Sequence, residues 1–275
     1  MSSTVIYEKR GEVAYITINR PECLNALDKS VHKNLGEIWD DFESDKEIRV
    51  GVLTGMGNKS FSVGQDLKEL SEGLEKGEQP TSFGSAGAAG SPRLTERFEM
   101  SKPLIGRING YAFGGGFELA LVCDILIASD NAKFALPEAK LGLIPGAGGI
   151  FRLVRHMPYK VALGFLMTGQ EISAQKAYDC GLVNQVVAYE ELDTCVLGWI
   201  KDILRCSPLS VMSIKEVARR SMDLDLEDAF KEKYFWEQHR INGNDCREGP
   251  KAFIEKRKPN WNVVNIVRHS SAFRQ

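Results

Sequence analysis

Two glutamates stand in apolar stretches of this sequence, where a carboxylate is costly unless it is paired or used in chemistry. Glu118 lies between Phe117 and a Leu-Ala-Leu run, and Glu138 follows Phe-Ala-Leu-Pro. Two such carboxylates that share one water could exchange its protons, as general acid–base catalysis requires. Each glutamate could instead be a salt-bridged residue of the core, so the residues alone leave both interpretations open.

Three consecutive glycines, Gly114, Gly115 and Gly116, precede Glu118 between a predicted strand and a predicted helix. Glycine lets a ligand approach the backbone closely. The first N–H groups of a helix are unpaired and lie at the positive end of its dipole. Such a turn can hold an anion or a developing oxyanion, although a glycine-rich packing turn is the alternative.

A second turn of this kind lies at 61–70, where a predicted strand end runs into a helix. Asp66 stands near the start of that helix. The turn could supply a second free N–H group beside the glycine turn. The alternative is that Asp66 is only a helix cap.

The elements that must position these groups alternate between strand and helix. A helix is predicted at 30–44 from its apolar spacing, with Asp28 or Ser30 as its cap. This alternation is typical of β-α-β units with right-handed crossovers. Short runs rich in β-branched residues predict strands at 13–19, 49–54, 104–108, 125–128 and 183–187.

From about residue 190 onward the sequence predicts only helices. We therefore expect a core domain at 1–200 and a C-terminal helical region at 201–275, which folds over the core or packs against another subunit. The low-complexity segment 84–91 is either a flexible surface loop or the wall of a pocket. Helical patterns occupy 190–205, 208–221, 226–241 and 248–257.

Composition excludes several classes of protein. The 275 residues carry 35 Lys and Arg against 37 Asp and Glu, a net charge of −2, which argues against a nucleic-acid partner. No uncharged apolar run approaches the ~18 residues of a membrane span. The charged start of the chain predicts no signal peptide, and the scattered cysteines predict no disulfides, so we expect a cytoplasmic protein. The four histidines lack metal-ligand spacing, and P-loop and nucleophile-elbow motifs are absent.

The motifs together resemble those of the crotonase superfamily, also called the enoyl-CoA hydratase/isomerase family, over roughly residues 5–260. The resemblance implies a spiral of ββα repeats, a C-terminal helical region used in trimerisation, and a homotrimer or dimer of trimers. It implies a coenzyme A thioester substrate and no separate cofactor or metal. The matching motifs are Asn19-Arg20-Pro21, Leu24-Asn25-Ala26-Leu27, Gly64-Gln65-Asp66-Leu67-Lys68, Asn109-Gly110 through Glu118, Pro137-Glu138 through Gly142, and Pro145-Gly146-Ala147-Gly148-Gly149.

The resemblance also implies the roles of site residues. The backbone N–H groups of Gln65 and Gly115 match the family's oxyanion hole, Glu118 matches the residue that activates water, and Glu138 matches the proton donor to C2. Arg20 and Lys68 are candidate neighbours of the coenzyme A phosphates, and the acyl pocket is expected to involve Phe113, Phe117, Leu136 and the 73–98 region. The other positions expected to contact the substrate are Cys23, Leu24, Ala26, Gly64, Asp66, Leu67, Gly114, Pro137 and Gly146.

Because both glutamates are present, the resemblance favours an enzyme that adds water to a 2-enoyl-CoA or dehydrates a 3-hydroxyacyl-CoA. A Δ3,Δ2-enoyl-CoA isomerase, which commonly keeps only the residue at 138, and a non-catalytic RNA-binding or scaffold protein are alternatives. The segments 111–121 and 134–142 are similar to the carnitinyl-CoA dehydratase branch. That branch tends to have Trp at the position of Gln65, and Asp-Ser in place of Gly146-Ala147.

Overall fold

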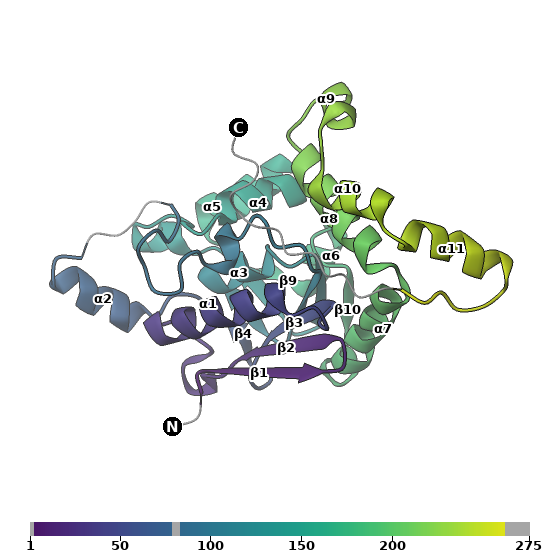
Figure 1. Cartoon of the computed structure of the whole chain (residues 1–275). Coiled ribbons are helices and arrows are strands. Elements are labelled where there is room, and N and C mark those ends of the chain that lie inside the picture. Colours follow the sequence, from purple (N-terminus) through teal and green to yellow (C-terminus); the bar gives the residue numbers. More distant parts are fainter. Residues whose placement is uncertain (1–2, 79–82, 262–275) are drawn as a thin grey trace.

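Two sheets and the helices around them form the core of the computed structural model, which describes residues 3–78 and 83–261 (Figure 1). The order in the six-stranded sheet is β1-β2-β3-β5-β7-β10, and in the four-stranded sheet it is β4-β6-β8-β9. The strands are β1 Val5–Arg10, β2 Val13–Ile18, β3 Val50–Gly55, β4 Ser60–Ser62, β5 Leu104–Ile108, β6 Tyr111–Phe113, β7 Ile125–Ser129, β8 Lys133–Ala135, β9 Ile172–Ser173 and β10 Gln185–Val187.

The chain winds as the spiral of ββα repeats that the family resemblance implied. In three successive turns a strand of the large sheet (β3, β5, β7) is followed by a strand of the small sheet (β4, β6, β8) and then by a helix. Within each sheet these three strands are parallel to one another. The pairs β1–β2 and β8–β9 are antiparallel. The helices are α1 Lys29–Ser44, α2 Leu67–Glu75, α3 Gly115–Ala120, α4 Gly149–His156, α5 Tyr159–Thr168, α6 Ala174–Asp179, α7 Leu192–Arg205, α8 Pro208–Ser221, α9 Leu226–Lys231, α10 Phe235–Asn242 and α11 Asp245–Ile254, with short 3-10 helices η1 Pro21–Cys23, η2 Leu94–Glu96, η3 Glu138–Leu141 and η4 Tyr189–Glu191.

Side-chain alternation divides the core between the two faces of the large sheet. On β3, Val50 and Val52 pack with Leu192 and Val196 of α7, while Leu53 points into the larger cluster on the other face. The large cluster includes residues from both sheets and the buried face of α1. The large sheet is therefore covered on both sides, as a mostly parallel sheet requires.

The small sheet places the candidate site residues. Gln65 follows the end of β4, Gly115 follows the end of β6, and Glu138 follows the end of β8, each within two or three residues. Because β4, β6 and β8 are parallel neighbours, these positions meet at one edge of the sheet. Three repeats therefore each contribute one part of the site.

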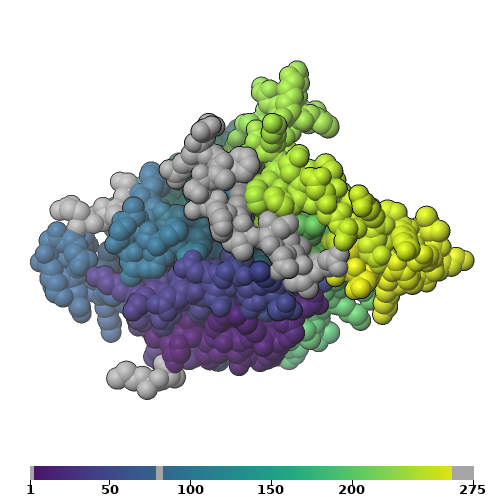
Figure 2. Space-filling view, in the orientation of Figure 1, coloured from purple at the N-terminus to yellow at the C-terminus, as the bar shows by residue number. Residues whose placement is uncertain are grey.

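The C-terminal helices α8 to α11 extend away from the two sheets (Figure 1) and form the protruding green and yellow part of the surface in Figure 2. The helix predicted at 226–241 is wrong as one element, because it divides into α9 and α10. The buried Glu216 carboxylate of α8 accepts the N–H of Trp236 over 2.7 Å, which replaces a helical hydrogen bond at the break. The proposed division at residue 200 stays a prediction, and residues 262–275 lie outside the described part.

Several predicted elements are confirmed with small shifts. The strands at 13–19, 49–54, 104–108 and 125–128 correspond to β2, β3, β5 and β7, and the strand at 183–187 shortens to β10. Asp28 rather than Ser30 caps α1, accepting the N–H of Val31 over 2.8 Å. The helix predicted at 248–257 begins at Asp245, three residues before the predicted start. In the described residues no helix is long and apolar enough to cross a membrane.

Candidate active site

A cavity of about 410 Å³ brings the predicted site residues together. Gln65, Gly115, Glu118, Glu138 and Gly146 all line it. They come from four separate segments of the sequence, so their convergence is a property of the fold.

Glu118 lies in the first turn of α3 and is almost completely buried, with 3% of its surface exposed. Its Oε1 accepts the N–H of Gly149, the first residue of α4, over 2.8 Å. Burial raises the pKa of Glu118, whereas the hydrogen bonds from Gly149 and Ala147 and the nearby Arg152 guanidinium oppose that rise. The carboxylate is therefore held in one orientation by backbone donors.

Arg152 is a neighbour of this site that the sequence did not single out. Its guanidinium donates to the carbonyl of Thr95 over 2.6 Å and to that of Ala147 over 3.3 Å. Both acceptors belong to cavity-lining residues. Arg152 thus ties two walls of the cavity together and places a positive charge near Glu118.

Glu138 opens the 3-10 helix η3 and is less tightly held. Its Oε2 is enclosed and has no hydrogen-bond partner among the described residues. Burial, followed by the charge of Glu118, raises the pKa of Glu138 to about 7, although its own N–H opposes the rise. A carboxyl group with this pKa can both give and take a proton near neutral pH.

Two backbone N–H groups face the same region. The Leu27 N–H donates to the Gly64 carbonyl over 2.8 Å and the Asp66 N–H to the Leu27 carbonyl over 3.0 Å, so the N–H of Gln65 between them points the other way. Gly115 begins α3, where N–H groups have no acceptor within the helix. Within the described residues neither N–H has an acceptor.

Glycine is required where the two N–H groups approach each other. Gly64 has φ +83°, and a Cβ there would lie 2.5 Å from the Gly115 nitrogen. Gly114 has φ +51°, and a Cβ there would lie 3.3 Å from Oε1 of Glu138. Larger residues at these positions would displace the N–H groups or the glutamate.

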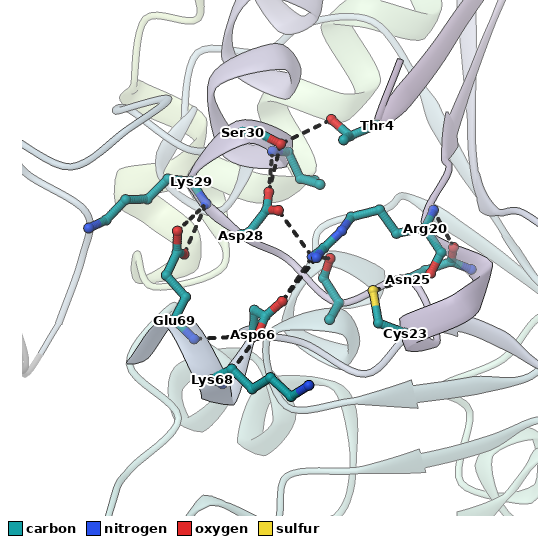
Figure 3. A network of polar contacts seen from close by, with 12 residues as sticks. Thr4, Arg20, Cys23, Asn25, Asp28, Lys29, Ser30, Asp66, Lys68 and Glu69 are labelled. Atoms are coloured by element: carbon teal, nitrogen blue, oxygen red, sulfur yellow. Dashed lines mark hydrogen bonds and ion pairs between the residues drawn. The ribbon is translucent and has the colours of Figure 1, made fainter. Parts of the chain in front are cut away.

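Arg20 and Asp66 form a structural network beside this turn (Figure 3). The Asp66 carboxylate caps α2 by accepting the N–H of Lys68 over 3.2 Å, and it accepts both Arg20 Nη groups over 3.1 Å. Arg20 also contacts Asp28 at 3.3 Å and donates to the Ala26 carbonyl over 2.8 Å. The guanidinium expected near the phosphates is therefore held by two carboxylates.

Lys68 differs from Arg20. Its ammonium extends away from the Arg20 network in Figure 3 and forms no ion pair within the described residues. A phosphate role for Lys68 stays a prediction. The other expected substrate contacts outside the cavity lining also stay predictions; they are Cys23, Leu24, Ala26, Gly64, Asp66, Leu67, Gly114 and Pro137.

The expected acyl pocket matches this cavity only in part and stays a prediction. Gly84, Gly90, Arg93, Leu94 and Thr95 of the 73–98 region line the cavity, whereas Phe113, Phe117 and Leu136 are not among its lining residues. Phe117 packs against Phe134 in the core with ring centroids 5.1 Å apart, Phe113 pairs with Tyr111 at 5.1 Å, and the Leu136 side chain is buried. Phe117 and Leu136 thus belong to the core beneath the site, whereas Phe113 is half-buried.

Other residues form the cavity wall in their place. Gly84 and Gly90 of the low-complexity segment line the cavity, so this segment is a pocket wall. Sequence reasoning missed His32 and Trp39, which also line the cavity, and it covered Arg93 only as part of the broad 73–98 region. His32 and Trp39 could have been found from their helical spacing on the apolar face of α1, whereas no pattern marks Arg93.

The arrangement defines an enzyme site for proton transfer beside a carbonyl group. Two carboxylates share a cavity with a pair of free N–H groups suited to a developing oxyanion. Among the described residues no cluster of three His, Cys, Asp or Glu side chains could hold a metal ion.

Comparisons with known proteins agree with this class. The family profile described as enoyl-CoA hydratase/isomerase matches residues 8–263. Carnitinyl-CoA dehydratase of Proteus mirabilis is 41% identical over 268 residues, covering 95% of this chain and 99% of the relative, and that of Escherichia coli strain K12 is 39% identical over the same lengths. The chain belongs to the enoyl-CoA hydratase/isomerase family, and it is an enzyme of the hydro-lyase type.

Solved structures support the same fold. Enoyl-CoA hydratase EchA1 of Mycobacterium marinum has a TM-score of 0.85 at 33% identity, with 96% of this chain and 100% of that chain covered. Carnitinyl-CoA hydratase of Mycobacterium avium has a TM-score of 0.71 at 38% identity, with the same coverage. The crotonase-type fold predicted from the motifs is therefore confirmed.

Proposed function

We propose that this enzyme reversibly adds water to a 2-enoyl-CoA thioester with Glu118 and Glu138 as its acid–base pair. The observation that carries the proposal is the contrast between the two carboxyl groups in one cavity. Glu118 is oriented by the N–H of Gly149, whereas Glu138 has one oxygen without a partner in the described part of the chain and a pKa of about 7. Groups with different environments are suited to different steps of one proton transfer.

In the hydration direction, the N–H groups of Gln65 and Gly115 bind the thioester oxygen and stabilise the enolate-like transition state. Glu118 orients the water and helps to remove its proton. The water oxygen bonds to C3, and Glu138 gives its proton to C2. The proton taken from the water then returns the two carboxyl groups to their starting protonation state. Dehydration runs the same steps backwards, with Glu138 taking the proton from C2.

Coenzyme A enters as part of the substrate, and we propose that no separate cofactor takes part. Residues 23–26 and 64–68 are proposed to flank the coenzyme, with Lys68 close to its phosphates. The cytoplasm is the proposed location.

An assembly of three chains, or a dimer of such trimers, is proposed from the family pattern. The exposed apolar side chains of the C-terminal helices support it, because large exposed apolar groups on one region mark a contact surface. They include Leu226, Phe230, Phe253 and Ile254.

Dehydration of a carnitinyl thioester is a second candidate activity, favoured by the names of the relatives that are 39–41% identical. Isomerase activity is a third, and it would need Glu138 much more than Glu118. These alternatives differ in acyl group and in their dependence on Glu118.

The test follows the loss of the enoyl-thioester ultraviolet band with crotonyl-CoA. Glu118→Gln and Glu138→Gln are each expected to lower the rate by roughly 10²–10⁴-fold. Glu171→Gln is the matched control, because Glu171 is exposed and pairs with Lys133 on the surface. Full hydratase activity in Glu138→Gln would overturn the proposed mechanism.

A further inference from the structure

The cavity wall outside the acid–base pair carries polar groups that no step above uses. His32 and Trp39 of α1 and Arg93, which precedes η2, all line the cavity. Seven enclosed side-chain polar atoms in the described residues lack a hydrogen-bond partner. Four of them belong to the cavity-lining residues His32, Trp39, Arg93 and Glu138. Unsatisfied polarity is therefore concentrated at this cavity.

Arg93 is the most unusual of these residues. Within residues 3–78 and 83–261 its guanidinium forms no ion pair and no hydrogen bond, and its Nε is enclosed by protein. Burial lowers the pKa of Arg93, as expected for a cation removed from water. A partly buried cation without a partner is costly and calls for an anion.

Two carboxylates near Arg93 do not supply that anion. Glu96 accepts the N–H of Ser85 over 2.8 Å and also binds the Ser85 hydroxyl, while Glu69 accepts the N–H of Lys29 over 3.0 Å. Both favour the charged form of Arg93 from a distance, but neither pairs with its guanidinium. The charge of Arg93 remains available to a ligand in the cavity.

His32 does not add a competing positive charge. Burial and the nearby Arg93 lower the pKa of His32 to about 4, so its imidazole is neutral at pH 7. The Gln65 side chain acts on this pKa in the opposite direction. His32, Gln65 and Arg93 all line the cavity, so the proposed oxyanion hole and Arg93 belong to one space.

We propose that the acyl group of the substrate ends in a carboxylate, and that the Arg93 guanidinium binds it. This proposal rests on the hydration activity proposed above and specifies its substrate class. A planar guanidinium forms two parallel hydrogen bonds with a carboxylate. A trimethylammonium group, as in carnitine, has no N–H to donate and would be repelled by Arg93. The charge of Arg93 therefore opposes the acyl group for which the carnitinyl relatives are named, although Glu118 and Glu138 line the same cavity.

The test compares three enoyl thioesters with the wild-type enzyme: pent-2-enedioyl-CoA, crotonyl-CoA and crotonobetainyl-CoA. We expect kcat/KM to decrease in that order. Arg93→Gln is expected to lower kcat/KM for pent-2-enedioyl-CoA by roughly 10- to 100-fold, as for loss of a charged hydrogen bond, and to change that for crotonyl-CoA little. Arg10→Gln is the matched control, because Arg10 is exposed on β1, outside the cavity lining, where it pairs with Glu8 and lies over the Tyr15 ring.

A binding measurement tests the proposal without turnover. Pentanedioyl-CoA should bind the wild-type enzyme more tightly than butanoyl-CoA by calorimetry, and Arg93→Gln should abolish the difference while Arg93→Lys keeps part of it. Equal binding of both thioesters by wild-type enzyme, or an equal loss for both in Arg93→Gln, would overturn the carboxylate assignment. Hydration of crotonyl-CoA would then still support the proposed function, whereas no hydration of any enoyl thioester would overturn both.

Discussion

The N–H of Gly149 and the carboxylate of Glu118 are joined by a 2.8 Å hydrogen bond that links the start of α4 to the first turn of α3. The two residues are so close that a Cβ on Gly149 would lie 3.0 Å from both Cγ and Oε1 of Glu118. One backbone group thus fixes the position of a buried carboxylate.

Gly149→Ala is expected to lower kcat about tenfold or more, because the added methyl group displaces the Glu118 carboxylate and misplaces the water. The fold should remain, since Ala is a better helix former than Gly. Steady-state kinetics and thermal unfolding check this. Gly164→Ala in α5 is the control, because no atom lies within 4 Å of its added Cβ; equal kinetics in both variants would contradict the positioning role.

The pKa of Glu138, raised to about 7, predicts one shared pH profile for the two directions of the reaction. Hydration takes up no net proton, so the ratio of the two kcat/KM values is the equilibrium constant and does not change with pH. Both directions need one proton on the Glu118–Glu138 pair, so both kcat/KM values should decline as pH rises above about 7. Measuring both directions with one substrate pair checks this, and profiles that stay flat between pH 6 and 8.5 would contradict it.

The same carboxyl group makes stability depend on pH. Between the ordinary pKa of 4.5 and about 7, the folded chain keeps a proton on Glu138 that the unfolded chain has lost. Raising the pH through this window therefore lowers the free energy of unfolding. Urea denaturation should therefore show that, from pH 4.5 to 7, the free energy of unfolding of the wild type falls relative to that of Glu138→Gln. A constant difference would show that the environment does not raise this pKa.

Asp66→Ala is expected to cost about 1–3 kcal/mol of unfolding free energy, because it removes the cap of α2 and leaves the partly buried Arg20 with one carboxylate fewer. Asp66→Asn should cost less, since an amide oxygen can still cap the helix. Urea denaturation of both variants separates the cap from the ion pair. Equal losses would show that the cap contributes little.

Phe253→Glu is expected to shift the protein from trimer to smaller species, because Phe253 is 86% exposed on α11 in a single chain and would meet a neighbour in the assembly. Light scattering after size-exclusion chromatography measures the mass. Lys251→Glu on the same helix is the control for added negative charge. A wild-type protein that is a monomer at all concentrations would overturn the proposed assembly.

Glu118 and Glu138 were singled out because they are carboxylates in apolar stretches, and Gln65 and Gly115 came from the family resemblance. All four line one cavity, and their catalytic roles stay predictions. Most of the small sheet was missed because strands of three residues, such as Lys133–Ala135, are too short to show a period. β1 was missed as well, because its charged residues hide the alternation.

Other misses depend on contacts that are distant in the sequence. The division between α9 and α10 arises from a hydrogen bond donated to Glu216, twenty residues before Trp236. Arg93 carries no local pattern, and its meaning comes only from the cavity it lines and the lack of a partner in the described chain. Such features can be recognised only in the folded structure.

Successive repeats of the spiral each supply one part of the site, as Gln65 after β4, Gly115 after β6 and Glu138 after β8 show. The segment between α2 and β5, which includes Arg93, belongs to only one of these repeats. Substitutions or insertions there alter the cavity wall while the strands that align Glu138 and the N–H groups of Gln65 and Gly115 stay in register. In such an architecture, selectivity and chemistry can diverge independently during evolution.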